Sequence, residues 1–259
     1  MSIDSDAATR PASGVQSVGR ALDLLEILAD AGGQLGIGEM ASRTDIPLPT
    51  IHRLLQTLVD RGYVRRLASR RYALGFRLVP LGQSAGSLLG ADAQVVLGGL
   101  VDALGESANL AALSGDHAEY VAQVPSRHSM RMFTEVGRRV ELHCTGVGKA
   151  LLAGLDDEQV AGIVRRVGTP AYTEHTVTTA DDLRAALDVV RRQGYAIDEQ
   201  EQELGVRCVA VAVPLGSPAT LAVSVSGPSP RMSDEVVARA VPLLQDAARR
   251  LATGLAGTV

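Results

Sequence analysis

Apolar residues near the start of the chain recur at helical spacing. In the segment "VQSVGRALDLLEILADA" they fall every three or four positions, which predicts a helix with one buried face. We expect that face to hold Val18, Leu22, Leu25 and Leu28. Two glycines end this helix, and "GIGEMASRTD" predicts a short second helix with Met40 and Ala41 directed inward.

A third helix is predicted from Thr50 to Arg61, directly after the tight connection "IPLPT". Its apolar residues follow the i, i+3, i+4, i+7 pattern of a single buried face. After Gly62 the period changes, and two short strands are expected at 63–64 and 72–74, joined by "RRLASRR". Three helices followed by a basic hairpin are typical of a winged helix-turn-helix domain.

The next segment, from 76 to 104, has a helical pattern that glycines interrupt, which is typical of a connector. We place the domain boundary near Gly90. The expected organisation is a disordered tail at 1–14, a winged helix-turn-helix domain at 15–75, a linker helix at 76–90 and a second domain at 91–259.

Strands and helices alternate in the second domain. We expect a hairpin around Gly115-Asp116, a further strand at 129–136, and two buried strands in "VRCVAVAVPLG" and "TLAVSVSGP". Two amphipathic helices with acidic first turns precede the buried strands, and a last helix spans 234–255. These elements predict an α+β fold with an antiparallel sheet.

Charge is distributed unevenly along the chain. The net charge of -4 combines nine Arg against six acids over residues 15–77 with fifteen basic residues against twenty-one acids over 78–259. Residues 61–77 hold six Arg and no acid. A basic segment ahead of an acidic body is typical of a nucleic-acid-binding module joined to another domain, although charge alone also fits a solvated surface.

The polar face of the third helix carries side chains that can read DNA. Arg donates paired hydrogen bonds to guanine and Gln to adenine, while Thr hydroxyls and helix N-terminal amides bind phosphate. The hairpin arginines are placed to straddle a phosphate backbone or to enter a minor groove. Each side chain taken singly fits a solvated helix face, but together they predict DNA binding. The expected DNA-binding residues are Thr50, His52, Arg53, Gln56, Thr57, Arg65, Arg66, Arg70 and Arg71.

Composition argues against several classes of protein. No apolar run approaches the roughly 18 residues of a membrane span, and the N-terminal tail lacks the apolar core of a signal peptide. Two cysteines, Cys144 and Cys208, are too few for a disulfide framework or a zinc cluster. We therefore expect a cytoplasmic protein with free thiols and with neither a metal nor a cofactor.

The segment "HCTGVGKALLAG" places Lys149, the single lysine of the chain, in a glycine-rich turn ahead of a helix. A phosphate-binding loop requires G-x-x-x-x-G-K followed by Ser or Thr, and His143 and Ala150 occupy the first and last of those positions. The helix start still favours a small anion, because Gly146 and Gly148 let backbone amides approach it. Lys149 either balances that charge or anchors the helix through a surface ion pair.

Two other classes of protein can be weighed against a DNA-binding regulator. An enzyme is disfavoured because no metal-binding spacing such as His-Glu-x-x-His occurs, and because His143 and Cys144 would point apart in a strand. We therefore expect no catalytic residues. A pure oligomerisation module is disfavoured by the arginine hairpin.

Six blocks of the sequence occur in an order and spacing that can be compared with known families. They are "VQSVGRALDLLEILA", "LPTIHRLLQTLVDRGYV", "YALGFRLVPLG", "HCTGVGKALLA", "GYAIDEQEQELGVRCVAVAVPLG" and "LAVSVSGPSPRMS". Together they resemble the IclR family of bacterial transcriptional regulators from Val15 to Leu251. The resemblance implies a winged helix, a linker helix used in dimerisation, and a GAF-like effector domain that senses small metabolites in dimers or tetramers. The chain departs from the family at "PLPT", where many members have Ser or Lys just before the Thr.

Polar side chains in the buried strands indicate a ligand pocket. Ser224 and Ser226 lie two apart, so both hydroxyls face one side, and a ligand carboxylate or carbonyl could supply the partners that buried hydroxyls need. The same residues also fit a polar sheet edge with Cys208 in the core. Resemblance to the glyoxylate-responsive allantoin-utilisation repressors of the family implies a pocket for a small oxoacid. Its residues would be Gly146, Val147, Asp198, Val206, Cys208, Ser224 and Ser226.

We therefore hypothesise a repressor of allantoin or ureide catabolism genes that glyoxylate or allantoate controls. In that pocket Asp198 would bond a hydroxyl or hydrated aldehyde rather than the ligand carboxylate. The expected partners are operator DNA, the small carboxylate and further copies of the chain. The alternative is a regulator of the same family that responds to an aromatic or sugar-derived acid.

Overall fold

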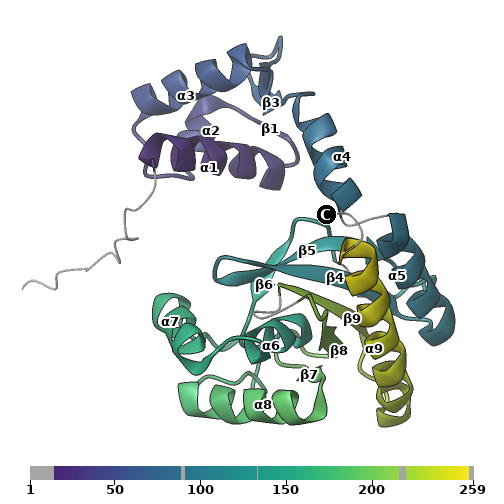
Figure 1. The fold of residues 1–259 in the computed structure, drawn as a ribbon. Helices are drawn as coiled ribbons and strands as arrows, with labels where there is room; N and C mark the ends of the chain where they lie inside the picture. Colours follow the sequence, from purple (N-terminus) through teal and green to yellow (C-terminus); the bar gives the residue numbers. More distant parts are fainter. Residues whose placement is uncertain (1–14, 89–90, 133, 216–219, 257–259) are drawn as a thin grey trace, which may run out of the picture. The chain divides into compact units, whose positions relative to one another are not determined.

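Three helices and a three-stranded sheet form the N-terminal part of this computed structural model, which describes residues 15–88, 91–132, 134–215 and 220–256. The helices are α1 (Gln16–Asp30), α2 (Ile37–Ala41) and α3 (Leu48–Asp60), and the strands are β1 (Gln34–Leu35), β2 (Val64–Arg66) and β3 (Tyr72–Leu74). β3 lies between β1 and β2 and is antiparallel to both. This arrangement confirms the predicted winged helix-turn-helix domain and adds β1, a strand of two residues that is too short to leave a periodic signal (Figure 1).

The core of this domain is aliphatic and is centred on α3. Leu24 and Leu28 of α1 pack with Met40, Ile51 and Leu55.

The expected burial of Val18 and Leu22 is wrong, because these side chains are 55% and 53% exposed. The apolar residues of α1 form two overlapping stripes along the helix. Packing against α3 buries the stripe that contains Leu24.

The chain divides into two units, Met1–Ala85 and Gly86–Val259, and the division falls within α4 (Leu78–Leu88). The second unit contains a six-stranded antiparallel sheet with the order β6-β5-β4-β9-β8-β7. Its strands are β4 (Ser107–Ser114), β5 (His117–Val124), β6 (Arg139–Glu141), β7 (Ala196–Glu199), β8 (Val206–Ala212) and β9 (Leu221–Pro228). Its helices are α5 (Ala91–Leu104), α6 (Gly146–Ala153), α7 (Asp157–Val167), α8 (Ala180–Gln193) and α9 (Asp234–Ala256).

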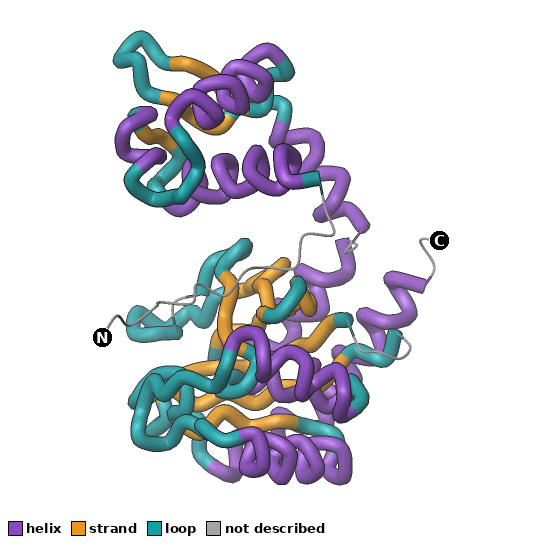
Figure 2. The backbone as a smooth tube through the Cα atoms, turned by 90° about the vertical axis from the view of Figure 1, so that its left-hand side faces the viewer, coloured by secondary structure: helices purple, strands orange, loops and turns teal. Residues whose placement is uncertain are grey.

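Helices cover both faces of this sheet (Figures 1 and 2). α5 and α9 pack together on one face, where Leu97, Leu244 and the odd-numbered valines of β9 form one core. α6 and α8 pack on the other face, where Leu151 and Leu187 form a second core. Because side chains alternate along a strand, each central strand contributes to both cores, and the polar residues of β9 face α6.

The strand expected at 129–136 is wrong for the residues that the structure describes there. Residues 129–132 and 134–136 form a loop, and residue 133 lies outside the described residues. A turn closed by the Arg138 amide on the Glu135 carbonyl, with Gly137 at a φ of 91°, reverses the chain. The strand that pairs with β5 therefore begins only at Arg139.

Candidate functional site

Helix α3 presents a polar surface opposite its buried face. His52, Arg53, Gln56 and Thr57 are exposed, and Thr50 is half-buried. The predicted polar face of this helix is therefore accessible to a partner.

Local hydrogen bonds already occupy two of those side chains. Gln56 donates to Asp60 at 2.7 Å, and Thr57 donates back to the Arg53 carbonyl at 3.0 Å. The first turn of α3 offers few free amides, because Pro49 has none and the Thr50 amide bonds the Pro47 carbonyl. The side chains that remain most available for base contacts are His52 and Arg53.

The four predicted arginines of the β2–β3 hairpin differ in whether they contact other side chains of the domain. Arg65 lies 4.6 Å from the centre of the Phe76 ring, and Arg71 pairs with Glu39 at 3.0 Å, so both hold parts of the domain together. Arg66 and Arg70 are exposed and have no ion-pair partner among the described residues. Arg70 sits at the hairpin turn with a φ of 62°.

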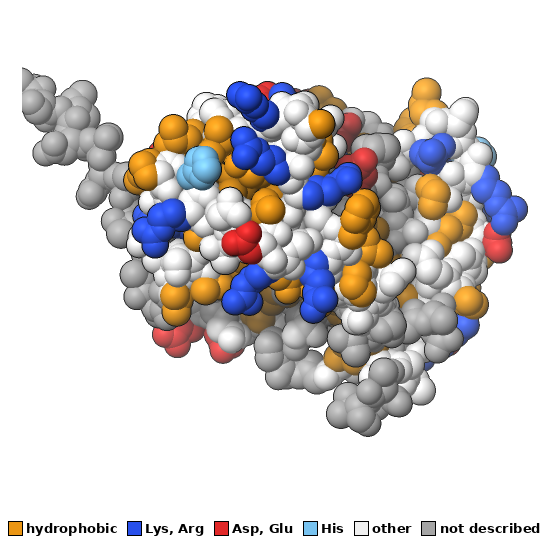
Figure 3. All heavy atoms as spheres, turned by 90° about the horizontal axis from the view of Figure 1, so that it is seen from above, with side chains coloured by type: hydrophobic (Ala, Val, Ile, Leu, Met, Phe, Trp, Pro, Cys, Tyr) orange, Lys and Arg blue, Asp and Glu red, His pale blue; other side chains and the backbone are white. Residues whose placement is uncertain are grey.

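Figure 3 shows basic side chains spread over this domain, with few acidic ones between them. An accessible cationic surface of this kind favours the phosphate backbone of a nucleic acid. The domain can therefore present a polar helix flanked by two freely exposed arginines.

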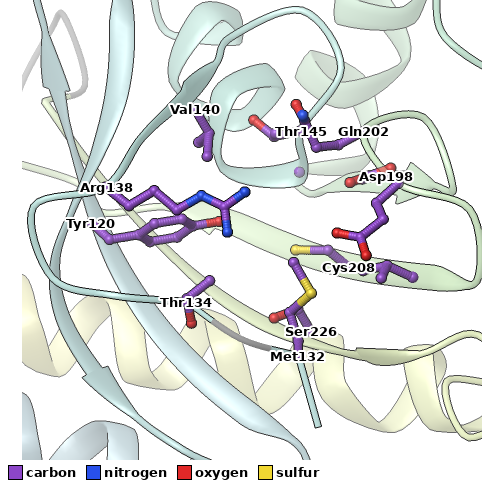
Figure 4. A pocket seen from close by; sticks show the side chains of 13 residues that line it. Tyr120, Met132, Thr134, Arg138, Val140, Thr145, Asp198, Gln202, Cys208 and Ser226 are labelled. Carbon is purple, nitrogen blue, oxygen red and sulfur yellow. The ribbon is translucent and has the colours of Figure 1, made fainter. Parts of the chain in front are cut away.

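A second candidate site is a narrow pocket between the start of α6 and the large sheet, lined by residues of β5, β6, β7, β8 and β9. We call it the β5–β9 pocket. Its lining residues are Tyr120, Met132, Thr134, Arg138, Val140, Thr145, Gly146, Asp198, Gln202, Glu203, Val206, Cys208 and Ser226. The space open to the centre of a water-sized group is about 20 Å³, which is near the least volume that holds a water. In Figure 4, Tyr120 and Arg138 lie on one side of this space, facing Asp198 and Cys208.

Strand pairing brings three of the polar residues together. Asp198 of β7 stands opposite Cys208 of β8, which stands opposite Ser226 of β9. Tyr120 reaches the pocket because of a bulge in β5. Leu110 pairs with Ala122 and Ala111 with Tyr120, so one extra residue changes which face Tyr120 occupies.

Asp198 is held in an unusual protonation state. Its side chain is 4% exposed and accepts a 2.8 Å hydrogen bond from the Glu201 amide. Burial raises the pKa of Asp198 to about 7, and the nearby Glu201 carboxylate adds to the rise, while backbone amides and Lys149 oppose it. Near neutral pH a large share of Asp198 is therefore the neutral acid, which can donate a hydrogen bond.

Other polar groups of the pocket also present hydrogens. Burial raises the pKa of the Tyr120 phenol, so it keeps its proton. Arg138 brings a positive charge that acts on Tyr120. Thr145 is already occupied, because it caps α6 by accepting from the Gly148 amide and donates to the Glu141 carbonyl. Tyr120, Arg138 and the neutral form of Asp198 thus give the pocket several donors, beside the Glu203 carboxylate that also lines it.

Lys149 is neither a ligand group nor a surface anchor. It is 5% exposed and forms a buried ion pair with Glu201, which lies in the loop between β7 and β8. Of the two roles left open for Lys149, an ion pair that anchors the helix is present, but it is buried and not on the surface. Gly148 also has a packing role, since a Cβ there would stand 2.4 Å from the Leu142 carbonyl oxygen.

The predicted effector residues separate into two groups. Gly146, Asp198, Val206, Cys208 and Ser226 line the pocket, whereas Val147 and Ser224 are fully buried and do not. Ser224 lies near the Cys208 thiol, and burial raises the pKa of that thiol to about 12.

His143 and Cys144 lie in a bend ahead of α6, not in a strand. They have separate partners, the Pro170 carbonyl and the Gln202 side chain. Neither is therefore bonded to the other as a nucleophile and base would be.

Comparison with known proteins places both domains in one family. A family model of the IclR helix-turn-helix domain matches residues 17–68, and a model of the bacterial transcriptional regulator IclR C-terminal domain matches residues 88–253. The chain belongs to the IclR family. Its members are transcriptional regulators and not enzymes, so this protein is a DNA-binding regulator of the repressor type found in the family.

Similar IclR-family proteins align along nearly their whole length. The transcriptional repressor IclR of Escherichia coli (strain K12) is 35% identical over 263 residues, covering 96% of this chain and 94% of its own. The repressor AllR of the same organism is 30% identical over 251 residues, covering 93% and 91%. The crystal structure of a regulator from Alicyclobacillus acidocaldarius has a TM-score of 0.84 at 29% identity, covering 93% of this chain and 99% of that one.

Residues that the family resemblance did not supply also shape the pocket, above all Tyr120, Arg138 and Thr134. A bulge hides Tyr120 from any period-two pattern, and Arg138 and Thr134 lie in or beside an irregular loop. Among the described residues, no helix has the length and apolarity to span a membrane, and no three His, Cys, Asp or Glu side chains gather as metal ligands.

Proposed function

We propose that this IclR-family regulator represses its target genes through α3 and the β2–β3 hairpin, and that a small carboxylate in the β5–β9 pocket controls its binding to the operator. We further propose glyoxylate, with allantoate as the related candidate, as the effector, and genes of allantoin or ureide catabolism as the targets. His52, Arg53, Arg66 and Arg70 would make the contacts with DNA.

The donor character of the pocket supports a carboxylate. Tyr120, Ser226 and the neutral form of Asp198 can each donate, and Arg138 supplies positive charge. A carboxylate accepts up to about four hydrogen bonds and donates none. An acid beside an anion is tolerable here because Asp198 can hold its proton, so it can bond the carboxylate itself as well as a hydroxyl.

The narrowness of the pocket supports an effector of few atoms. With about 20 Å³ open to water-sized groups, every candidate effector requires the walls to move, and glyoxylate, with about five non-hydrogen atoms, requires the smallest movement. The similarity to AllR and to IclR supports repression in general. It does not favour AllR, because IclR is the more identical of the two, and the choice of glyoxylate therefore stands on the pocket.

A gel-shift titration tests the proposal directly. The full chain is mixed with the DNA upstream of its own gene, and glyoxylate, allantoate, 4-hydroxybenzoate and a sugar-derived acid are added up to about millimolar concentration. We expect glyoxylate to change the fraction of bound DNA. A response to an aromatic or sugar acid alone would show that the effector assignment is wrong.

Two variants separate the two sites. Ser226→Ala should abolish the response to glyoxylate while leaving DNA binding intact, because Ser226 lines the pocket and belongs to the unit that does not contain α3. Arg53→Ala should weaken DNA binding while the protein still shows a glyoxylate-dependent rise in melting temperature. If the wild-type chain bound no upstream DNA at any salt concentration, the proposed repressor role itself would fail.

A further inference from the structure

A chain of buried hydrogen bonds leads from the pocket into the sheet. Asn109 of β4 is fully buried, and its amide nitrogen donates to the Ser226 hydroxyl at 3.1 Å. Its amide oxygen accepts from the Thr134 hydroxyl at 2.8 Å. Thr134 in turn accepts from the side-chain amide of Gln123 in β5. Four side chains from β5, the following loop, β4 and β9 are thus joined in one row.

The direction of these bonds determines which hydrogen is left for a ligand. Each hydroxyl has a single hydrogen. Thr134 gives its hydrogen to Asn109, and Ser226 accepts from Asn109, so the hydrogen of Ser226 is directed elsewhere. Ser226 lines the pocket, and the side of its hydroxyl that faces away from Asn109 is where a ligand would lie.

We propose that Gln123, Thr134 and Asn109 act as positioning residues that hold Ser226 as a hydrogen-bond donor. The row thereby selects effectors in which both oxygens accept, such as a carboxylate, over a primary amide, in which an NH2 donor replaces one of the two oxygens. This inference rests on the proposed function, since it concerns how the same pocket chooses its ligand.

The surroundings keep the row in one direction. Asn109 and Ser226 are both shielded from water, so no solvent molecule can easily replace a lost bond. Neighbouring bonds in a row polarise one another, and reversing one requires reversing all of them. Asn109 is also held by its strand, where it pairs with Ser224 of β9, so the amide can change its orientation only by rotating its own side chain.

The most informative variant is Gln123→Leu, because Gln123 is at the far end of the row and does not line the pocket. Calorimetric titration would measure the affinity of the full chain for glyoxylate and for its primary amide. We expect the ratio of the two affinities to fall about tenfold in Gln123→Leu. Without the Gln123 donor, Thr134 can accept from Asn109 and the Asn109 amide can turn over. Ser226 then gives its hydrogen to Asn109 and can accept from the amide of the ligand. Asn109→Leu should lower the ratio in the same direction.

The matched control is Gln193→Leu, which removes a glutamine that bonds the Tyr195 carbonyl at the end of α8. Its affinity ratio should equal that of the wild type. A merely structural role of Gln123 would weaken both ligands equally and leave the ratio unchanged, and that result would overturn the proposal.

A second measurement requires no ligand. The free energies of unfolding of Gln123→Leu, Ser226→Ala and the double variant should be non-additive, because Thr134 and Asn109 join the two residues in one row of hydrogen bonds. Additive values would overturn the proposal whatever the ligand data show. If the values were non-additive but the wild type bound neither probe, the row would stand and the proposed effector would fail.

Discussion

The two units of this protein place their charged groups in opposite settings. In the DNA-binding unit, Arg53 and Arg66 stand exposed and without ion-pair partners among the described residues. In the sensing unit, Lys149 and Asp198 are buried, and each is fixed by a neighbour in the β7–β8 loop. DNA binding draws on accessible positive charge that displaces counterions, whereas recognition of a small ligand draws on groups whose orientation and protonation are set beforehand.

The same contrast appears between two ion pairs. Arg71 and Glu39 are joined at 3.0 Å with both side chains more than a third exposed, whereas Lys149 and Glu201 are almost wholly buried. An exposed pair gains little because water screens it. A buried pair is costly to break because the remaining charge has no solvent.

The largest expected effect comes from breaking the buried pair. Lys149→Met should lower the free energy of unfolding by about 3–5 kcal/mol, because it leaves the Glu201 carboxylate buried without its cation. Urea denaturation checks this value. The double variant Lys149→Met/Glu201→Leu should recover most of the loss, and a single variant as stable as the wild type would contradict the contrast.

Arg53→Ala, on the exposed surface of α3, should weaken DNA binding without lowering the stability of the fold. We expect affinity for operator DNA to fall by about tenfold to a hundredfold, as for the loss of one base contact. Fluorescence anisotropy would measure the binding, and thermal melting should be unchanged. Arg184→Ala, an exposed arginine of α8 in the other unit, is the control that should alter neither quantity.

Next in size is the pH dependence that Asp198 confers. The folded chain raises its pKa to about 7, whereas an unfolded Asp ionises near ~3.9. The stabilisation from burying the neutral acid is therefore complete below about pH 4 and is lost as pH rises to about 7. Relative to Asp198→Asn, the wild type should lose about 2–3 kcal/mol of unfolding free energy between pH 5 and 8.

That difference can be measured by urea denaturation of both proteins at several pH values. Parallel pH curves would show that Asp198 titrates normally. The affinity of the wild type for glyoxylate should also fall above about pH 7, because the ionised Asp198 repels a carboxylate, and Asp198→Asn should remove this dependence.

The smallest effect is expected at the exposed pair. Glu39→Ala should lower stability only slightly, because it removes an exposed ion pair and one exposed hydrogen bond from the Gly36 amide at the start of α2. The same variant frees Arg71, so affinity for non-specific DNA should rise slightly and its salt dependence should steepen. A loss of stability comparable to that of Lys149→Met would remove the distinction between the two settings.

The predictability of the two units from sequence follows the same division. The winged helix was recognisable because the face of α3 and the acid-free run of arginines are contiguous in sequence. Sequence could not show which arginines have partners within the domain. Arg65 contacts the Phe76 ring, 11 positions away, and Arg71 pairs with Glu39, 32 positions away.

The pocket was recognisable only in part. Ser226, Cys208 and Asp198 lie in regular strands, where alternation and the family resemblance place them on one face. Tyr120 depends on a bulge, and Asn109 on a partner 117 positions away. Sequence leaves the role of Lys149 open because a lone lysine is ordinarily solvated, and the burial of its partner Glu201 arises from a loop that has no periodic pattern.

The alternation along β9 has a consequence for how such a protein can change over time. Val223 and Val225 belong to the core beneath α5 and α9, while Ser224 and Ser226 face α6. Of these four residues only Ser226 lines the pocket, so a substitution there would alter the proposed ligand contacts, whereas one at Val223 or Val225 would alter the core beneath α5 and α9. Residues of β9 on the α6 face and residues on the α5 face can therefore be substituted separately. A change of ligand contact at Ser226 would leave the core next to α5 in place.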